Sequence, residues 1–471
     1  MRRIPKRIWG MGLLVVIYLL VAYVAPRPVS IKPEGWRLFA LFVATVAGMI
    51  FQPIAGGALV LIAVVFSSVV GGLSIKQALD GYSDPTNWMV LAAFFISRSL
   101  INTGLARRIA LFFVRSFGQT SLGVSYALCF SDMALATIIP SNGARSGGVI
   151  LPIVRSVAEL YGSKPGATAG VIGAFLMTSV YQGVCVSSAM FLTGQASNPL
   201  AAQLASKAAN IQIDWFGWFR AGLAPGLVSI FAVPWLVSKI YKPEVTHTPE
   251  AAQFARTELS NMGRLSRNEW ILTAVFVGVC GTWATSGLHH LDVAVPALFG
   301  TIALLVTGVL TWDDVKKEES AWDIFIWYGG LLNLAKALNA TGVPTEFAKA
   351  VGGALQGLDW YPLMMIALMV YFFAHYAFAS ITAHVLAMFP AFVAVIVAAG
   401  APPGLTVFAF AMFANLSAGL TNYGTTPSPM FFAQGYVDMK SWWRVGLLCA
   451  LLNLAIWSTV GFAWWKFLGI W

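Results

Sequence analysis

The sequence predicts an all-α polytopic membrane protein with about 11 transmembrane helices, arranged as two inverted repeats with re-entrant hairpins and broken helices. Three observations lead to this prediction: the composition, the recurrence of long apolar runs, and the similarity of the two halves. Of the 471 residues, 58% are hydrophobic and only 10% are charged, whereas an average soluble domain is about 25% charged. Most of the chain is therefore expected to lie in lipid.

Long apolar runs recur along the whole chain. Each could form the core of a membrane span, which needs ~20 residues with its flanks. Between them lie further apolar stretches that Gly, Pro, Ser and Asn interrupt. The uninterrupted runs are residues 10–25, 36–54, 56–70, 89–105, 221–240, 270–283, 294–310, 324–338, 363–379 and 445–465.

The first apolar run follows Arg2, Arg3, Lys6 and Arg7, and no small-residue cleavage site comes after it. This pattern indicates a retained first helix rather than a secretory signal. Because cytoplasmic segments carry an excess of Lys and Arg, we expect residues 1–30 to form an N-terminal helix that begins in the cytoplasm.

The net charge of +10 does not indicate nucleic-acid binding, because the Lys and Arg residues lie mainly in short connectors and at helix ends. There they anchor the topology of the chain. Cys129, Cys185, Cys280 and Cys449 lie singly in apolar surroundings. Without paired Cys or Cys/His spacing we expect packing residues, with no metal cluster, no disulfide framework and no cofactor.

The two halves of the chain resemble each other at a nearly constant offset, which indicates an internal repeat. The matches follow the same order in both halves, and a short deletion in the second half explains the smaller last offset. The matched segments are 97–110 with 335–348 at an offset of 238 residues, 141–145 with 380–384 at 239, and 187–199 with 417–429 at 230.

A long polar connector, residues 242–268, separates the halves and is basic enough to be cytoplasmic. Repeat 1 is then expected over 31–241 and repeat 2 over 269–471. With the N-terminus and the connector both inside, an even number of spans precedes the connector. One extra helix leaves an odd number for each repeat, so the two repeats are inverted. The basic segments 106–117 and 344–351 are predicted as amphipathic helices in the membrane interface.

Four short breaks rich in Gly, Pro, Ser or Asn interrupt apolar segments at positions that the repeat matches. In hydrocarbon such breaks are tolerated only where they face protein or a water-filled cavity, and paired breaks point to the binding site of a transporter. Each new helix N-terminus offers free N–H groups and a positive dipole end to a carboxylate or phosphate. The alternative is that the Ser and Thr residues bond carbonyls of their own helix and only bend it. The breaks are 140–143, 194–199, 380–382 and 424–427.

Three segments carry a resemblance to a known family: PSNGARSGGVILPI (140–153), FASITAHV (378–385) and SAGLTNYGTTPSPMFF (417–432). Over nearly its whole length the chain resembles the divalent anion:sodium symporter family, whose repeats each carry a hairpin ending in Ser-Asn-Thr and a later broken helix. It is most similar to the branch of bacterial citrate/succinate and tartrate/succinate antiporters and the plastid 2-oxoglutarate/malate translocator.

This resemblance implies a secondary transporter for small organic anions such as succinate, malate, tartrate, 2-oxoglutarate or citrate in the inner (plasma) membrane. It also implies elevator-type alternating access by a homodimer embedded in lipid. The substrate carboxylates would be held at the two hairpin tips and at the later breaks. The substrate-binding residues implied in this way are Ser141, Asn142, Gly143, Gln195, Ser380, Thr382, Thr425, Thr426 and Pro427.

Two positions depart from the family motifs, because Gly143 stands where the first motif has Thr and Ile381 where the second has Asn. Ile offers no oxygen to sodium, which needs several oxygen ligands. We therefore expect exchange without sodium, with sodium-coupled dicarboxylate symport, or proton-coupled uptake, as the alternative. The missing side chain at Gly143 would also leave room for a bulkier or hydroxylated substrate. A single sodium ion, if present, would use Thr137, Ser141, Asn142 and Gly194.

Arg145 and its repeat mate His384 lie beside the hairpin tips, and ionisable groups within a membrane are functional by default. We expect each to replace the positive charge that a bound sodium ion would provide. The alternative for Arg145 is a helix-end residue that snorkels to the interface or bonds backbone carbonyls. For His384 it is gating or a core contact. His375 is expected to form hydrogen bonds in the core, and Asp132 to cap the hairpin or accept a proton.

Other functional classes fit the sequence less well. An intramembrane enzyme is not expected, since the chain has no HExxH, no GxSxG and no paired aspartates within its spans. A channel would not need broken helices at symmetric positions of two inverted halves.

Overall fold

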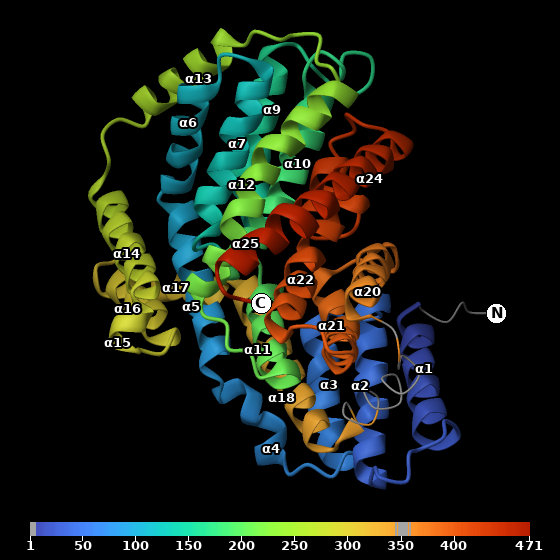
Figure 1. The fold of residues 1–471 in the computed structure, drawn as a ribbon. Coiled ribbons are helices and arrows are strands. Elements are labelled where there is room, and N and C mark those ends of the chain that lie inside the picture. Colours follow the sequence, from blue (N-terminus) through green and yellow to red (C-terminus); the bar gives the residue numbers. More distant parts are fainter. Residues whose placement is uncertain (1–5, 344–345, 347–356, 358) are drawn as a thin grey trace, which may run out of the picture.

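A computed structural model describes residues 6–343, 346, 357 and 359–471 (Figure 1). Helices dominate this part, and the β pairing within it is limited to a bridge between Thr120 and His247. Seven of the described helices are long and apolar enough to cross a membrane, or eight if one bent pair counts as a single span. The predicted all-α membrane class is confirmed, whereas the number of about 11 spans stays a prediction.

The first half begins with helices that pack pairwise. α1 packs on α2, α2 on α3, and α5 continues into α6 after a bend of 64°. The elements are α1 (Lys6–Leu19), η1 (Leu20–Val24), α2 (Pro33–Phe51), α3 (Gly56–Val69), α4 (Ile75–Leu79), η2 (Asp80–Ser83), α5 (Pro85–Asn102) and α6 (Leu105–Phe117).

The rest of the first half contains the first two predicted breaks. One separates α7 from α8, and the other separates α10 from α11. The elements are α7 (Ser121–Ala136), α8 (Asn142–Arg145), η3 (Ser146–Ile150), α9 (Leu151–Leu160), α10 (Gly173–Met190), η4 (Leu192–Gly194), α11 (Ser197–Ala209) and α12 (Trp215–Ile240).

The second half follows the connector, which itself contains the helix α13. Its breaks separate α20 from α21 and α22 from α23. The elements are α13 (Pro249–Asn261), α14 (Arg267–Ala284), α15 (Ser286–His289), α16 (Ala294–Val306), α17 (Trp312–Lys317), α18 (Glu319–Ala340), α20 (Trp360–Ala374), η5 (His375–Ala377), α21 (Ile381–Ala398), α22 (Pro403–Leu416), η6 (Ser417–Leu420), α23 (Pro427–Phe432), α24 (Met439–Ile456), η7 (Trp457–Gly461) and α25 (Phe462–Phe467).

The predicted amphipathic segment 106–117 forms the helix α6. Leu105, Ala110 and Val114 are buried on one face. Its basic residues bind the connector side of the molecule: Arg107 lies 2.6 Å from Glu258 and Arg108 lies 2.7 Å from Glu269. Its place in the membrane interface stays a prediction. For the second predicted segment, residues 344–345 and 347–351 lie outside the described part of the chain.

The ribbon shows which elements meet around the breaks (Figure 1). α6, α7, α9, α10 and α12 run side by side at one end of the molecule, while α1, α2 and α3 lie together at the other. α22 packs on α10, α11 and α21 and is buried almost completely, in contrast to α1, which is 6% buried over its span. The broken helices of both halves thus surround a common centre, and α1 is left on the outside.

Candidate functional site

Both hairpin tips begin a new helix with the same local geometry. The Ser141 hydroxyl accepts a hydrogen bond from the backbone N–H of Ala144 at 3.1 Å, so Ser141 caps α8. The Ser380 hydroxyl accepts one from Ala383 at 3.4 Å and caps α21. Serine is preferred at this position because its oxygen satisfies a donor that the helix leaves free. The matched serines therefore place a helix N-terminus at each tip.

The later breaks also share their geometry. A side chain at Gly194 would place its Cβ 2.6 Å from the Ser188 carbonyl oxygen, and one at Gly424 would place it 2.6 Å from the Ala418 carbonyl oxygen. Real Cβ atoms do not approach backbone oxygens so closely, so both turns require glycine. Sequence positions that match by repeat thus adopt matching turns.

Asn142 joins the first tip to both later breaks. Its side-chain nitrogen donates to Gln195 Oε1 at 2.7 Å and to Thr425 Oγ1 at 2.9 Å. Gln195 in turn donates to Ser197 Oγ at 2.6 Å. Asn142, Gln195 and Thr425 are all buried. The structure therefore brings three predicted binding residues, from both halves of the chain, into one hydrogen-bonded group.

Gly143 and Thr426 meet at the same place. A Cβ on Gly143 would lie 2.7 Å from Cγ2 of Thr426. The expectation that Gly143 leaves room for a bulkier substrate is therefore wrong for this structure, because the Thr426 methyl group fills that room. Pro427 follows as the first residue of α23, where its missing N–H costs nothing.

The second tip contributes less to this group. Ser380 and Thr382 are half-buried. Among the described residues, neither side chain forms a hydrogen bond with Asn142, Gln195 or Thr425. The structure thus unites Asn142, Gly143, Gln195, Thr425 and Thr426, and it leaves the hydroxyl of Thr382 free for another acceptor or donor.

Arg145 is fully buried, and each of its three guanidinium nitrogens has a hydrogen-bond partner. Its Nε lies 3.0 Å from Asp132 Oδ1, and Nη1 donates to the carbonyls of Ile139 at 2.7 Å and Gly194 at 2.6 Å. Nη2 donates to Ser188 Oγ at 3.1 Å. Burial excludes the interpretation that Arg145 snorkels to the interface, whereas the backbone-carbonyl alternative describes what is seen. Its positive charge is balanced by Asp132 rather than left free for a substrate.

His384 occupies the repeat position of Arg145, and Tyr371 that of Asp132, both at an offset of 239 residues. The Tyr371 and His384 rings lie 4.2 Å apart, centroid to centroid. His384 Nδ1 is 3.0 Å from His375 Nδ1, and His375 Nε2 is 2.9 Å from the Gly424 carbonyl oxygen. The expected hydrogen bonding of His375 in the core is confirmed. In each half a basic side chain holds the carbonyl of the turn glycine.

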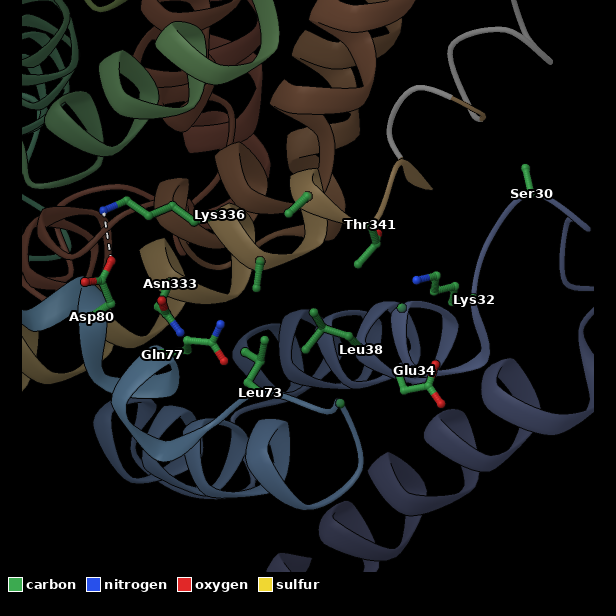
Figure 2. Close-up of a pocket in the computed structure, with 14 residues that line it drawn as sticks. Ser30, Lys32, Glu34, Leu38, Leu73, Gln77, Asp80, Asn333, Lys336 and Thr341 are labelled. Atoms are coloured by element: carbon green, nitrogen blue, oxygen red, sulfur yellow. Dashed lines mark ion pairs between the residues drawn. The ribbon is translucent and has the colours of Figure 1, made fainter.

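A separate cavity of about 540 Å³ lies between α2, α4 and α18, away from this group (Figure 2). Figure 2 shows Lys336 and Asp80 at one end, Leu38 and Leu73 in the middle, and Lys32 at the other end. The residues around it include none of those predicted to bind substrate.

The comparison with known proteins decides the family. The model of a family described as the sodium:sulfate symporter transmembrane region matches residues 5–471, nearly the whole chain. The chain belongs to the divalent anion:sodium symporter family. The resemblance seen in the hairpin motifs is thereby confirmed, and the protein is a multi-pass membrane transporter rather than an enzyme.

Two relatives of this chain have names that state what they transport. It is 43% identical over 460 residues to YflS of Bacillus subtilis, a protein named for malate transport, covering 98% of this chain and 96% of YflS. It is 40% identical over 457 residues to the chloroplastic dicarboxylate transporter 1 of Arabidopsis thaliana, covering 96% of this chain and 82% of the relative. The relatives of this chain are thus transporters of small organic anions.

A solved structure shares the fold at low sequence identity. The YdaH transporter of Alcanivorax borkumensis superposes with a TM-score of 0.56 at 13% identity, covering 98% of each chain. This likeness supports the all-helical fold of the chain and carries no statement about its substrate.

The four residues considered for a sodium ion already have hydrogen-bond partners in this structure, and a sodium site there stays a prediction. The Gly194 carbonyl already accepts a hydrogen bond from Arg145. The Thr137 hydroxyl donates to the Ala134 carbonyl at 2.7 Å, and the Thr137 carbonyl accepts from Thr193 at 2.6 Å.

Sequence reasoning missed the polar face of α10. Ser187 donates to Asp132, Ser188 accepts from Arg145, and Gln182 donates to the Gly419 carbonyl at 2.8 Å. The sequence does indicate this face, because α10 carries several polar residues although it is buried along its whole length. Buried polar groups need partners, so their density indicates a helix next to a polar site.

Proposed function

We propose that this protein exchanges di- and tricarboxylates, among them succinate, malate, tartrate, 2-oxoglutarate and citrate, across the inner membrane without sodium. The observation that carries this proposal is the 2.6 Å hydrogen bond from Arg145 to the Gly194 carbonyl. A resident guanidinium takes the backbone oxygen that a sodium ion would need. This contact disfavours a sodium ion in the first half, and Ile381 offers no amide oxygen in the second.

The substrate would bind at the hydrogen-bonded group around Asn142. Both hydrogens of its amide are engaged, one by Gln195 and one by Thr425. A carboxylate accepts stronger, charge-assisted hydrogen bonds than either oxygen does, so it would displace them. The N-termini of α8 and α21, with Ser141, Ser380 and Thr382, would hold its two ends.

Exchange requires that the site faces the two sides of the membrane in turn. We propose elevator-type movement of the broken helices against the outer helices within a homodimer, as the family resemblance implies. The contrasting burial of α22 and α1 supports this division, because one forms the centre of the molecule and the other its lipid-facing edge.

Transport into proteoliposomes tests the proposal. Vesicles containing the purified protein are loaded with buffer or with unlabelled malate, and uptake of labelled succinate is followed with and without a sodium gradient. We expect uptake only into malate-loaded vesicles, at the same rate in both gradients. Sodium-dependent uptake into vesicles without a counter-substrate would instead establish the symport alternative.

A matched variant tests the observation behind the proposal. Arg145→Gln removes the resident charge, and Asp132→Asn in the same chain removes its partner, so that neither is left unpaired. If Arg145 excludes sodium, this double variant gains dependence on sodium or loses exchange. Unchanged, sodium-independent exchange by the double variant would show that the guanidinium has no part in it.

A further inference from the structure

Two histidines of the second half share a single hydrogen. His375 Nε2 lies 2.9 Å from the Gly424 carbonyl oxygen, which can only accept, so this nitrogen carries a hydrogen. The Nδ1 atoms of His375 and His384 lie 3.0 Å apart, so one of them donates to the other. When both rings are neutral, His375 already has its hydrogen on Nε2. The hydrogen between the rings therefore belongs to His384.

Because the hydrogen of neutral His384 is on Nδ1, its Nε2 atom has no hydrogen and presents a lone pair. That atom is buried and has no hydrogen-bond partner among the described residues. The ring lies between two aromatic side chains, with centroid distances of 4.2 Å to Tyr371 and 5.0 Å to Phe378. A buried polar atom without a partner costs free energy, so its retention here requires an explanation.

The pair can take up one proton and no more. A proton on His384 Nε2 keeps the hydrogen bond between the rings and makes His384 an imidazolium. A second proton would place two N–H groups against each other between the Nδ1 atoms. The geometry therefore defines a site for a single positive charge.

Among the residues that the structure describes, the charged side chains on the helices around the pair have other partners. The helices that pack on α21 are α2, α11, α20 and α22. Their charged side chains are Glu34, Arg37 and Lys207, and Tyr371 is the titratable group in contact with the His384 ring. Glu34 pairs with Arg37, and Lys207 interacts with Asp80, Asp84 and Lys336.

We propose that His375 and His384 form a one-proton site that takes up a proton when a dicarboxylate binds at the adjoining turn. The proposal rests on the proposed function. The Gly424 carbonyl ties the pair to Thr425 and Thr426, so a bound anion lies next to it. In the first half Asp132 cancels the charge of Arg145. A proton on the pair supplies the positive charge that the first half does not.

Binding of the anion and of the proton then favour each other reciprocally. Dicarboxylate affinity is highest below the pH at which the free pair loses its proton. It falls as pH rises from there to the pH at which the substrate-bound pair loses its proton, and it is constant above that value. Because one proton is linked, the fall approaches but does not exceed tenfold per pH unit.

Isothermal titration calorimetry tests the proposal directly. The full-length protein in detergent is titrated with malate at several values between about pH 6.5 and 8, each in two buffers of different ionisation enthalpy. We expect the binding enthalpy to depend on the buffer, corresponding to uptake of up to one proton per site. We also expect His384→Gln and His375→Gln each to abolish that dependence. His247→Gln, an exposed histidine of the connector, should keep it.

The outcomes separate this inference from the proposed function. Malate binding with the same enthalpy in both buffers, and the same affinity across the pH range, would overturn the proton site and leave dicarboxylate binding intact. Because this comparison uses the unaltered protein, it holds even if a histidine variant fails to fold. Absence of malate binding at every pH would overturn both proposals together.

Discussion

Asp132 and Arg145 lie 13 residues apart, on opposite sides of the first hairpin tip. Both side chains are fully buried, and the pair satisfies each charge with further bonds from Ser187, Ser188 and backbone carbonyls. A buried pair is weak evidence for stability, but removing one partner leaves an uncompensated charge. At this position that charge would lie beside the binding site.

Asp132→Ala should therefore destabilise the folded protein by about 3–5 kcal/mol, because Arg145 keeps its charge without a partner. Thermal unfolding of the purified protein in detergent measures the loss. The control is Glu159→Ala, which breaks the exposed pair with Arg155 at 3.5 Å and should cost less than about 1 kcal/mol. Equal losses in the two variants would contradict the role given to burial.

Gly143 and Thr426 lie against each other in the candidate binding site and so determine its shape in this structure. Gly143→Ala places a methyl group 2.7 Å from Thr426 Cγ2 and should cost about 1–3 kcal/mol of overpacking. If the overpacking destabilises the conformation that binds substrate, the apparent affinity for the transported anion drops roughly 5- to 150-fold.

Thr426→Ser in the same chain removes that methyl and keeps the hydroxyl, so it should restore part of the lost affinity. Competition by unlabelled anion against labelled uptake gives both values. If Gly143→Ala leaves the affinity unchanged, residue 143 and Thr426 must move apart when the substrate binds.

At the scale of elements, the breaks could be predicted because their chemistry is local. Serine at a helix start and glycine at a turn that admits no Cβ are fixed by nearest neighbours, so Ser141, Ser380, Gly194 and Gly424 were found from sequence. What the polar side chains bind depends on which helices meet. The Asp132–Arg145 pair and the methyl that fills the space at Gly143 therefore could not be read from spacing.

The junction of α5, α11 and α18 is another contact that depends on which helices meet and cannot be predicted from local sequence. Asp84 begins α5 and also accepts from Gln203 on α11 at 3.4 Å and from Lys336 on α18 at 3.1 Å. α11 follows the break at 194–199 and would move with the broken helices, whereas α5 and α18 contain no break and would belong to the outer helices. Elevator-type movement would have to break these bonds in every cycle.

Asp84→Asn should keep the cap of α5 and weaken the charge-assisted bond to Lys336, which contributes about 1.5–3 kcal/mol. We expect exchange at saturating substrate to become faster, up to about tenfold, with little change in KM. Initial rates in loaded proteoliposomes measure both quantities, with Asp313→Asn as the control in an exposed pair. A change confined to KM would place Asp84 at the substrate rather than at a moving junction.

At the scale of the whole molecule, the two halves share their hairpin caps and turns but not their charges. The first half buries an ion pair, and the corresponding positions of the second hold Tyr371 and His384. Shared geometry suits two similar carboxylates of one substrate, while unequal charge makes the halves respond differently to pH. If the proposed function holds, the repeat would determine where a dianion lies, and the differences between the halves would regulate how tightly it binds.

A dianion held between two matching helix N-termini should depend equally on the two serine caps. Ser141→Ala and Ser380→Ala each remove an oxygen that orders a helix N-terminus, at a cost of about 1 kcal/mol to local stability. Each should also abolish most exchange while the protein still folds, because either carboxylate of the substrate loses its donors. Ser156→Ala, whose hydroxyl only bonds the Pro152 carbonyl of its own helix, should exchange normally. If one cap variant loses exchange and the other retains it, the substrate is held by one half alone, and the symmetric placement of a dianion between the tips is wrong.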